Sequence, residues 1–352
     1  MGERATPIPV TLLTGFLGSG KTTLLNHLLR DPGMADTAVI INEFGDVAID
    51  HLLVDSAIEN AMVLQSGCIC CSVRGDLVDT LDDLTAKVAR GELPAFARVA
   101  IETTGLADPA SIVRTLATEK LLAGRFALRA IVTTVDAANG AGQLDEFEEA
   151  RRQAALADVL ILTKTDLAEP GDTDPLEARL RRLNPGADIV PVLNGAIAPE
   201  ALFGHVPAVT GATGEEVLRW LRNADFPEHE VAGANPHDRG IQAFAVTIDR
   251  PVSREALRRW LGAVLSLRGK DLLRMKGLIH LSGAEGPLVV HAVQDVMHPP
   301  VQLAAWPDSD RTSRIVFITR GISQLALQRS LEQLVGGGPP DAKSAGSQEG
   351  PR

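Results

Sequence analysis

Eight consecutive residues have the types and spacing needed to hold the phosphates of a nucleotide. Residues 15–22 read Gly-Phe-Leu-Gly-Ser-Gly-Lys-Thr, between an apolar run and an amphipathic stretch, and match the pattern G-x-x-x-x-G-K-[ST]. In such a loop, backbone N–H groups and the positive end of the following helix face phosphate oxygens. We expect Lys21 to bridge the β- and γ-phosphates and the Thr22 hydroxyl to ligate Mg²⁺. The expected nucleotide contacts in this region are Gly15, Gly18, Ser19, Gly20, Lys21, Thr22 and Thr23.

Two segments with acidic residues each come directly after an apolar run. P-loop enzymes place the groups that respond to the γ-phosphate at such positions. Glu102 closes the run 99–101, and Gly105 follows three positions later, where such enzymes hold the Mg²⁺ shell. Gly105 can turn its N–H toward the γ-phosphate and release it after hydrolysis. Glu43 and Asp46 follow the run 38–41, which is the expected place of the first switch loop. The predicted catalytic residues are Lys21, Thr22, Glu43, Asp46, Glu102 and Gly105.

The segment Thr163-Lys164-Thr165-Asp166 predicts which base is bound. GTPases carry Asn-Lys-x-Asp here, and the Asp accepts hydrogen bonds from guanine N1 and N2, which adenine lacks as donors. Lys164 and Asp166 are present, but Thr163 takes the place of Asn and loses a side-chain amide contact. The loss of one hydrogen bond, roughly 1 kcal/mol, should weaken the guanine preference without abolishing it. A solvated Lys/Asp loop is the alternative interpretation.

The chain has three cysteines, Cys68, Cys70 and Cys71, all within four positions. An odd number packed so closely is not a disulfide framework, which favours a reducing compartment and hence the cytoplasm. Three thiolates can converge on one soft cation such as Zn²⁺, with sulfur at roughly 2.3 Å, and they leave a fourth position open for exchange or chemistry. A helix that begins near residues 75–76 would lower the pKa values of the thiols. Binding of Cu(I), buried structural cysteines and a redox pair are the alternatives.

The histidines are weaker metal candidates than the cysteines. Each alone is more often a surface or packed residue than a ligand, and no pair has the i, i+4 spacing of a helical metal site. One of them can still supply a fourth ligand. The five considered are His229, His237, His280, His291 and His298.

The groups named above lie on a chain in which predicted strands and helices alternate along the first 200 residues. Short apolar runs without period-2 alternation are typical of strands buried on both faces of a parallel sheet. The runs are 10–13, 38–41, 99–101, 130–132, 159–162 and 189–192. The helix candidates between them are 22–30, 76–90, 109–122, 145–157 and 175–183. This alternation predicts an α/β domain with a doubly wound, mostly parallel sheet over residues 1–204.

A different order of elements follows the first domain. Residues 205–239 are rich in Pro, Gly, Asn and His around one helix candidate, 214–223, and are predicted to be a connection. Residues 240–335 predict a smaller α+β domain. Its strands are 241–248, 272–281, 288–296 and 314–319, and its helices are 253–266, with Ser253 as N-cap, and 323–335. Residues 336–352 are Gly/Pro/Ser-rich and predict a disordered tail.

Bulk composition argues against several partners. The chain has 352 residues, a formal net charge of −11 and no tyrosine. We expect neither a nucleic-acid surface nor an anionic-membrane surface, because both require positive charge, and stacking platforms require aromatics. No signal peptide or membrane span is expected. A homodimer that forms with nucleotide or metal is compatible with the sequence.

Together these motifs resemble the CobW-like family of metallochaperone GTPases. The matching segments are 14–23, 42–45, 67–71, 102–109 and 163–166, with weaker matches at 273–277 and 315–318. The resemblance implies a GTPase that binds zinc, or cobalt or another divalent metal, at Cys68, Cys70 and Cys71. It also implies delivery of that metal to a client metalloprotein in a step driven by GTP hydrolysis. The expected cofactors are therefore GTP, Mg²⁺ and Zn²⁺.

Two other functional classes fit parts of the pattern. One is a GTPase assembly factor for a cofactor-dependent enzyme, in which the cysteines only hold a loop. The other is an ATP-dependent small-molecule kinase, which would prefer adenine and transfer phosphate instead of releasing it. The segment 163–166 disfavours the kinase because it matches guanine recognition.

Overall fold

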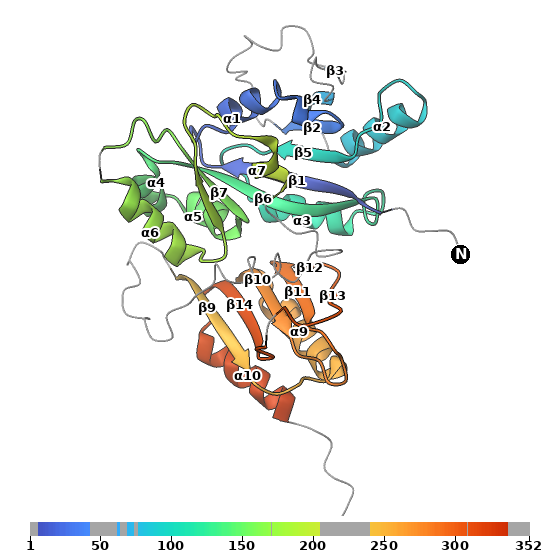
Figure 1. The fold of residues 1–352 in the computed structure, drawn as a ribbon, viewed down its shortest axis with the longest axis vertical. Helices are drawn as coiled ribbons and strands as arrows, with labels where there is room; N and C mark the ends of the chain where they lie inside the picture. The colour runs from blue at the N-terminus through green and yellow to red at the C-terminus, as the bar shows by residue number, and fades with distance from the viewer. Residues whose placement is uncertain are drawn as a thin grey trace, which may run out of the picture.

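The computed structural model describes residues 6–42, 62–63, 69–73, 77–169, 171–204, 240–307 and 309–336. These residues form two β-sheets, each with its own helices, stacked one above the other (Figure 1). The helix predicted at 214–223 and the tail predicted at 336–352 fall outside the described residues, apart from Gly336, which ends the last helix.

The N-terminal sheet has eight strands in the order β3-β4-β2-β5-β1-β6-β7-β8, and only β3 pairs antiparallel, with β4. The predicted α/β fold with a mostly parallel sheet is thereby confirmed. β1 lies between β5 and β6, so the strand order reverses at β1, and ligands of such sheets bind beside that switch point. The strands are β1 (Ile8–Gly15), β2 (Thr37–Asn42), β3 (Met62–Val63), β4 (Ile69–Val73), β5 (Arg98–Glu102), β6 (Phe126–Asp136), β7 (Val159–Thr163) and β8 (Asp188–Pro191).

Helices cover both faces of this sheet, and the period-2 alternation of the strands decides which side chain meets which face. Leu12 packs in the cluster with helices α2, α3, α5 and α6, whereas Leu13 packs with α1 and α7 on the opposite face. The helices are α1 (Lys21–Leu28), α2 (Leu77–Ala89), α3 (Pro109–Thr118), α4 (Gly140–Glu146), α5 (Glu148–Leu156), α6 (Thr173–Leu183) and α7 (Pro199–Phe203), with a 3₁₀ turn η1 (Pro32–Met34).

The single helix predicted over 145–157 is wrong. The chain forms two helices, α4 and α5, because Phe147 adopts an extended backbone with φ −111° and ψ 125°. The Phe147 ring stacks on Phe16 of the phosphate loop, with the ring centroids 4.5 Å apart. A contact with a residue far away in the sequence therefore accompanies the helix break, and no local pattern predicts it.

The C-terminal sheet is antiparallel, in the order β12-β11-β10-β14-β9, with β13 paired to β11. The helices α9 and α10 pack against it around Trp260 and Phe317, which confirms the smaller α+β unit. Ser253 caps α9 as predicted and accepts a hydrogen bond from the Ala256 N–H at 3.1 Å. The elements are β9 (Ile241–Ile248), α9 (Arg254–Arg268), β10 (Leu272–Ile279), β11 (Leu288–Val293), β12 (Val296–Met297), β13 (Val301–Gln302), β14 (Ser313–Arg320) and α10 (Gln324–Gly336).

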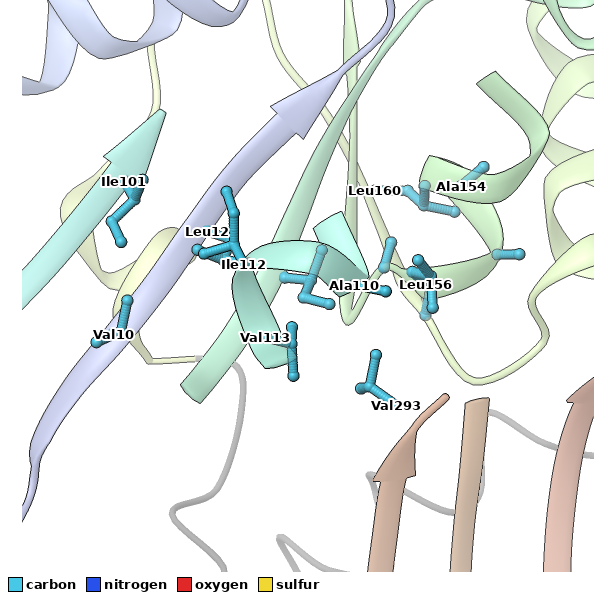
Figure 2. Packing of buried hydrophobic residues seen from close by; sticks show 14 of the residues in the cluster. Val10, Leu12, Ile101, Ala110, Ile112, Val113, Ala154, Leu156, Leu160 and Val293 are labelled. Atoms are coloured by element: carbon cyan, nitrogen blue, oxygen red, sulfur yellow. The ribbon is translucent and has the colours of Figure 1, made fainter. Parts of the chain in front are cut away.

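The two units meet in one hydrophobic cluster, although the C-terminal unit also has a core of its own. Leu273, Val293 and Ile318 of the C-terminal sheet belong to the same cluster as the α3 and α5 side chains. Figure 2 shows Val293 pointing up toward Val113 and Leu156 at this junction. Burial of this apolar surface holds the C-terminal sheet against the helices that follow the nucleotide-binding strands.

Candidate nucleotide and metal site

The phosphate loop has the predicted form, with strand β1 before it and helix α1 after it. Gly15 has φ 145°, and a Cβ placed there would lie 2.2 Å from Thr134 Oγ1 and 2.6 Å from the Thr134 carbonyl oxygen. Only glycine fits this position, because β6 presses against the loop. The Ser19 hydroxyl is hydrogen-bonded to Thr134 Oγ1 at 2.6 Å, which attaches the middle of the loop to β6.

The Lys21 side chain folds back over the phosphate loop. Its Nζ donates to the carbonyl oxygens of Gly15 at 2.9 Å and Phe16 at 3.2 Å. Burial lowers the pKa of Lys21, and the charge of Glu102 partly opposes that shift. A buried ammonium held by neutral carbonyl oxygens has free capacity for an anionic partner, as expected of the P-loop lysine.

The two groups predicted to hold Mg²⁺ are adjacent. The Thr22 hydroxyl donates to Glu102 Oε1 at 3.0 Å, although the residues lie 80 positions apart in the sequence. Glu102 is buried at the carboxyl end of β5, beside β1. A hydroxyl and a carboxylate are hard oxygen donors, so this pair fits the preference of Mg²⁺ for oxygen. When bound, the cation would neutralise charge on the β- and γ-phosphates.

Thr163 holds the segment 163–166, the predicted base-recognition segment, to the phosphate loop. Its Oγ1 donates to the Ser19 carbonyl oxygen at 2.7 Å and lies 3.2 Å from the Val135 carbonyl oxygen. Thr163 therefore connects β7, β6 and the phosphate loop through one hydroxyl. Asp166 lies three residues further on and is exposed, so its carboxylate is accessible to a ligand.

Asp136 is a buried carboxylate next to the segment 163–166 that the sequence analysis did not single out. It ends β6, is 1% exposed, and accepts a hydrogen bond from Lys164 Nζ at 2.8 Å. It also accepts from the N–H groups of Ala138 and Asn139. Burial alone would raise the pKa of Asp136, but the hydrogen bonds from Lys164 and Asn139 outweigh it and lower the pKa. A carboxylate that closes a buried strand was the available signal, as at Glu102.

Two of the three cysteines lie on the same sheet as the nucleotide site. Cys70 and Cys71 are in β4, a strand that the sequence analysis did not predict, and they pair with Val39 and Ile40 of β2. Ile40 in turn pairs with Ile101, the neighbour of Glu102 in β5. Two strand spacings, about 10 Å, therefore separate Cys71 in β4 from Ile101 in β5.

Three of the predicted site residues lie outside the described residues, namely Glu43, Asp46 and Cys68. Within the described part of the chain, no group of three His, Cys, Asp or Glu side chains could hold a metal ion. His291 and His298 stack with parallel rings 4.4 Å apart in the C-terminal unit. No helix among the described residues is long and apolar enough to span a membrane.

The phosphate loop, the Thr22–Glu102 pair and the sheet order define a P-loop nucleotide-binding domain. Residues 9–191 match the family described as "CobW/HypB/UreG, nucleotide-binding domain". Residues 241–335 match the "Cobalamin synthesis protein cobW C-terminal domain". The chain belongs to the CobW family, which confirms the resemblance stated above.

Similar proteins are named for GTPase activity and for zinc. The zinc chaperone YjiA of Escherichia coli (strain K12) is 35% identical over 312 residues, which cover 89% of this chain and 94% of that protein. The crystal structure of the Zn(II)-bound YjiA GTPase from E. coli has a TM-score of 0.71 and 32% identity, covering 93% of this chain and 99% of that one. The zinc-regulated GTPase metalloprotein activator 1 of Schizosaccharomyces pombe is 33% identical over 198 residues, 54% of this chain and 47% of that protein.

These likenesses bear on the expected activity and ligands. The relatives are named as GTPases and zinc chaperones, so the predicted GTPase class and the predicted ligands GTP, Mg²⁺ and Zn²⁺ are confirmed at the level of the family. Zinc ligation by the three cysteines and delivery to a client are further steps, which are taken up below.

Proposed function

We propose that this chain is a GTP-hydrolysing metallochaperone that binds a divalent metal, most readily zinc, through Cys68, Cys70 and Cys71. It would transfer the metal to a client metalloprotein, in the cytoplasm, in a step coupled to GTP hydrolysis. The observation that carries the proposal is the strand register. Cys71, Ile40 and Ile101 lie in one row across β4, β2 and β5, one residue from the row of Glu102.

The proposed nucleotide chemistry follows from the described contacts. Lys21, released from the carbonyl oxygens of its own loop, pairs with the β- and γ-phosphates, and Thr22 with Glu102 forms the oxygen set for Mg²⁺. Asp166 accepts from guanine, while Asp136 holds the Lys164 ammonium beside it. Gly105 turns its N–H to the γ-phosphate. Without an identified arginine finger, turnover should be about 10⁻⁴ to 10⁻² s⁻¹.

The proposed coupling between nucleotide and metal runs through β2. This strand lies between the cysteine strand β4 and β5, and its last residue, Asn42, precedes the expected first switch residues Glu43 and Asp46. If GTP orders that segment, it can change the environment of the thiolates in β4. Nucleotide shifts the metal equilibrium only if the GTP and GDP states bind the metal with different affinity.

The test is zinc binding to the reduced protein with GDP and with a non-hydrolysable GTP analogue. We expect one tightly bound zinc, an affinity that differs between the two nucleotides, and loss of binding in a Cys68/Cys70/Cys71→Ser triple variant. The control is Lys21→Met, which should keep zinc and lose the nucleotide dependence. Equal zinc affinity with both nucleotides would contradict the coupling, and zinc binding by the triple variant would contradict the site.

Client transfer requires a separate readout. A zinc-loaded sample mixed with an apo-metalloprotein and GTP should deliver metal faster than the same sample with GDP. An assembly factor whose cysteines only hold a loop behaves differently: Cys70→Ser lowers its stability but leaves metallation of the client unchanged.

A further inference from the structure

Helix α5 places a buried amide against the loop that follows Glu102. Gln153 is 1% exposed, and its Nε2 donates to the Gly105 carbonyl oxygen at 3.2 Å and to the Ala107 carbonyl oxygen at 3.0 Å. The Gln153 backbone is itself held, because Thr133 Oγ1 of β6 donates to its carbonyl oxygen at 3.0 Å. A rigid strand therefore supports the side chain that holds this loop.

The orientation of the Gln153 amide is determined by its partners. Two carbonyl oxygens can only accept, so the NH₂ group must face them, and both of its protons are used. The opposite atom, Oε1, is buried and accepts no hydrogen bond from the described residues. Rotating the amide would place an oxygen against two oxygens. The side chain is thus dedicated to the 105–107 backbone in one orientation.

Gly105 is confined on its other side by the phosphate loop. A Cβ at Gly105 would lie 2.6 Å from Leu17 Cδ2 and 2.8 Å from the Leu17 backbone N and Cα. The backbone at Gly105 therefore contacts the phosphate loop directly, while its carbonyl oxygen is held by Gln153. The backbone on the carbonyl side of Gly105 is therefore fixed, and only the peptide between Thr104 and Gly105, which carries the N–H, remains able to turn at the phosphate loop.

We propose that Gln153 is a positioning residue for GTP hydrolysis, which holds the 105–107 backbone against the phosphate loop so that the Gly105 N–H meets the γ-phosphate. The inference rests on the role of Gly105 in the proposed function. Gln153 does not touch the nucleotide, and its contribution is to pre-organise a donor before the transition state forms. Its loss lowers the rate of hydrolysis more than the binding of GTP.

The variants are Gln153→Met, which keeps the volume and removes both donors, and Gln153→Asn, which keeps the amide but is one methylene too short. Each is compared with the wild-type chain in steady-state phosphate release over a range of GTP concentrations and in binding of GDP and of a GTP analogue. We expect kcat to fall about tenfold or more while KM for GTP and the affinity for GDP change by less than about threefold.

Asn184, the C-cap residue of α6, offers a matched control because its side chain binds the end of α5. It is also 1% exposed, and its Nδ2 donates to three carbonyl oxygens at the end of α5, Ala154, Ala155 and Ala157, at 2.9, 3.1 and 2.8 Å. Asn184→Leu removes a buried amide that donates to the end of α5 and does not touch the 105–107 backbone. It should lower the melting temperature as Gln153→Met does, yet leave kcat within about threefold of wild type.

The outcomes separate this inference from the proposed function. Wild-type kcat in both Gln153 variants, or equal loss of kcat in Gln153→Met and Asn184→Leu, overturns the positioning role. A wild-type chain that releases no phosphate from GTP overturns the proposed function itself, before any variant is compared.

Discussion

At the scale of single residues, Lys21 and Thr163 make hydrogen bonds to the phosphate loop that the sequence pattern does not predict. Lys21 is buried and bonds to carbonyl oxygens of its own loop, so it contributes to the shape of the loop as well as to its charge. The Thr163 hydroxyl, in the segment predicted to bind the base, donates a hydrogen bond to the Ser19 carbonyl oxygen of the phosphate loop. Both residues therefore support the geometry of the loop, and Lys21 alone also supplies a positive charge.

Replacement of Lys21 tests the phosphate site. Lys21→Met should lower GTP turnover by about 100-fold or more, because it removes a cation from developing phosphate charge in a buried site. The fold should be retained, since the lost hydrogen bonds are local to residues 15–21. Turnover and circular dichroism of the purified variant measure both effects. A variant with wild-type turnover contradicts the assignment of this loop.

Replacement of Thr163 tests the connection between the base and the phosphate loop. Thr163→Val keeps the shape and removes the hydroxyl that bonds to Ser19. Because one or two buried hydrogen bonds are lost, the affinity for GTP and GDP should fall together by about tenfold. Preference for guanine over adenine should persist, because Asp166 is unchanged. Competition by ATP and GTP for a fluorescent GDP analogue measures this, and a selective loss of guanine preference would refute it.

At the scale of elements, the end of α5 and the start of β7 join the two units. Asp158 precedes β7, is 4% exposed and pairs with Arg274 of β10, and Lys276 Nζ of the same strand lies 3.2 Å from it. Arg274 also donates to the Leu156 carbonyl oxygen. A second contact, Arg320 to Glu148 at 2.6 Å, joins β14 to the first turn of α5 but is exposed to solvent.

The buried and exposed pairs should differ strongly in their effect on stability. Arg274→Met leaves Asp158 buried without its main partner and should lower the free energy of unfolding by about 3–5 kcal/mol. Arg320→Met removes a solvent-screened pair and should cost no more than about 1 kcal/mol. Urea denaturation of the two variants gives the comparison. Similar losses in both would show that burial of the first pair has no energetic consequence.

At the scale of the whole molecule, the charges buried between the two units make the free energy of unfolding depend on pH. The pKa of Lys276 is lowered from 10.5 to about 7 by burial and by Arg274, against the opposing effect of Asp158. Asp188 of β8 adds a second negative charge, whereas His291 of β11 is neutral in this range because burial holds its pKa well below 6.5. The folded chain therefore binds fewer protons here than the unfolded chain between about pH 7 and pH 10.5.

The sign of the pH effect follows from that difference. Because the unfolded state binds more protons in this window, the contribution of Lys276 to stability rises with pH from about 7 upward. In Lys276→Met this dependence is absent. As pH rises from 7, the unfolding free energy of the wild type should therefore increase relative to that of the variant by about 1 kcal/mol per pH unit. A difference that stays constant between pH 7 and pH 9 contradicts a lowered pKa.

The sequence alone determined the features that depend on neighbours along the chain. The phosphate loop, the apolar runs, the Ser253 cap and the order of strands and helices follow from turn chemistry and periodicity within about ten residues. These were sufficient for the fold class and the family, which the structure and the relatives confirm. The domain boundaries and the roles of the individual site residues remain predictions, and Glu43, Asp46 and Cys68 lie outside the described residues.

Only the tertiary structure decided which distant residues became partners. Lys164 meets Asp136 across 28 positions, Gln153 meets Gly105 across 48, and Arg274 meets Asp158 across 116. The helix break at Phe147 and the placement of Cys70 and Cys71 in a strand belong to the same class of feature. Local periodicity fixes which face of an element is apolar, whereas the partners of its polar groups depend on how packed layers align. That alignment is decided when the core forms.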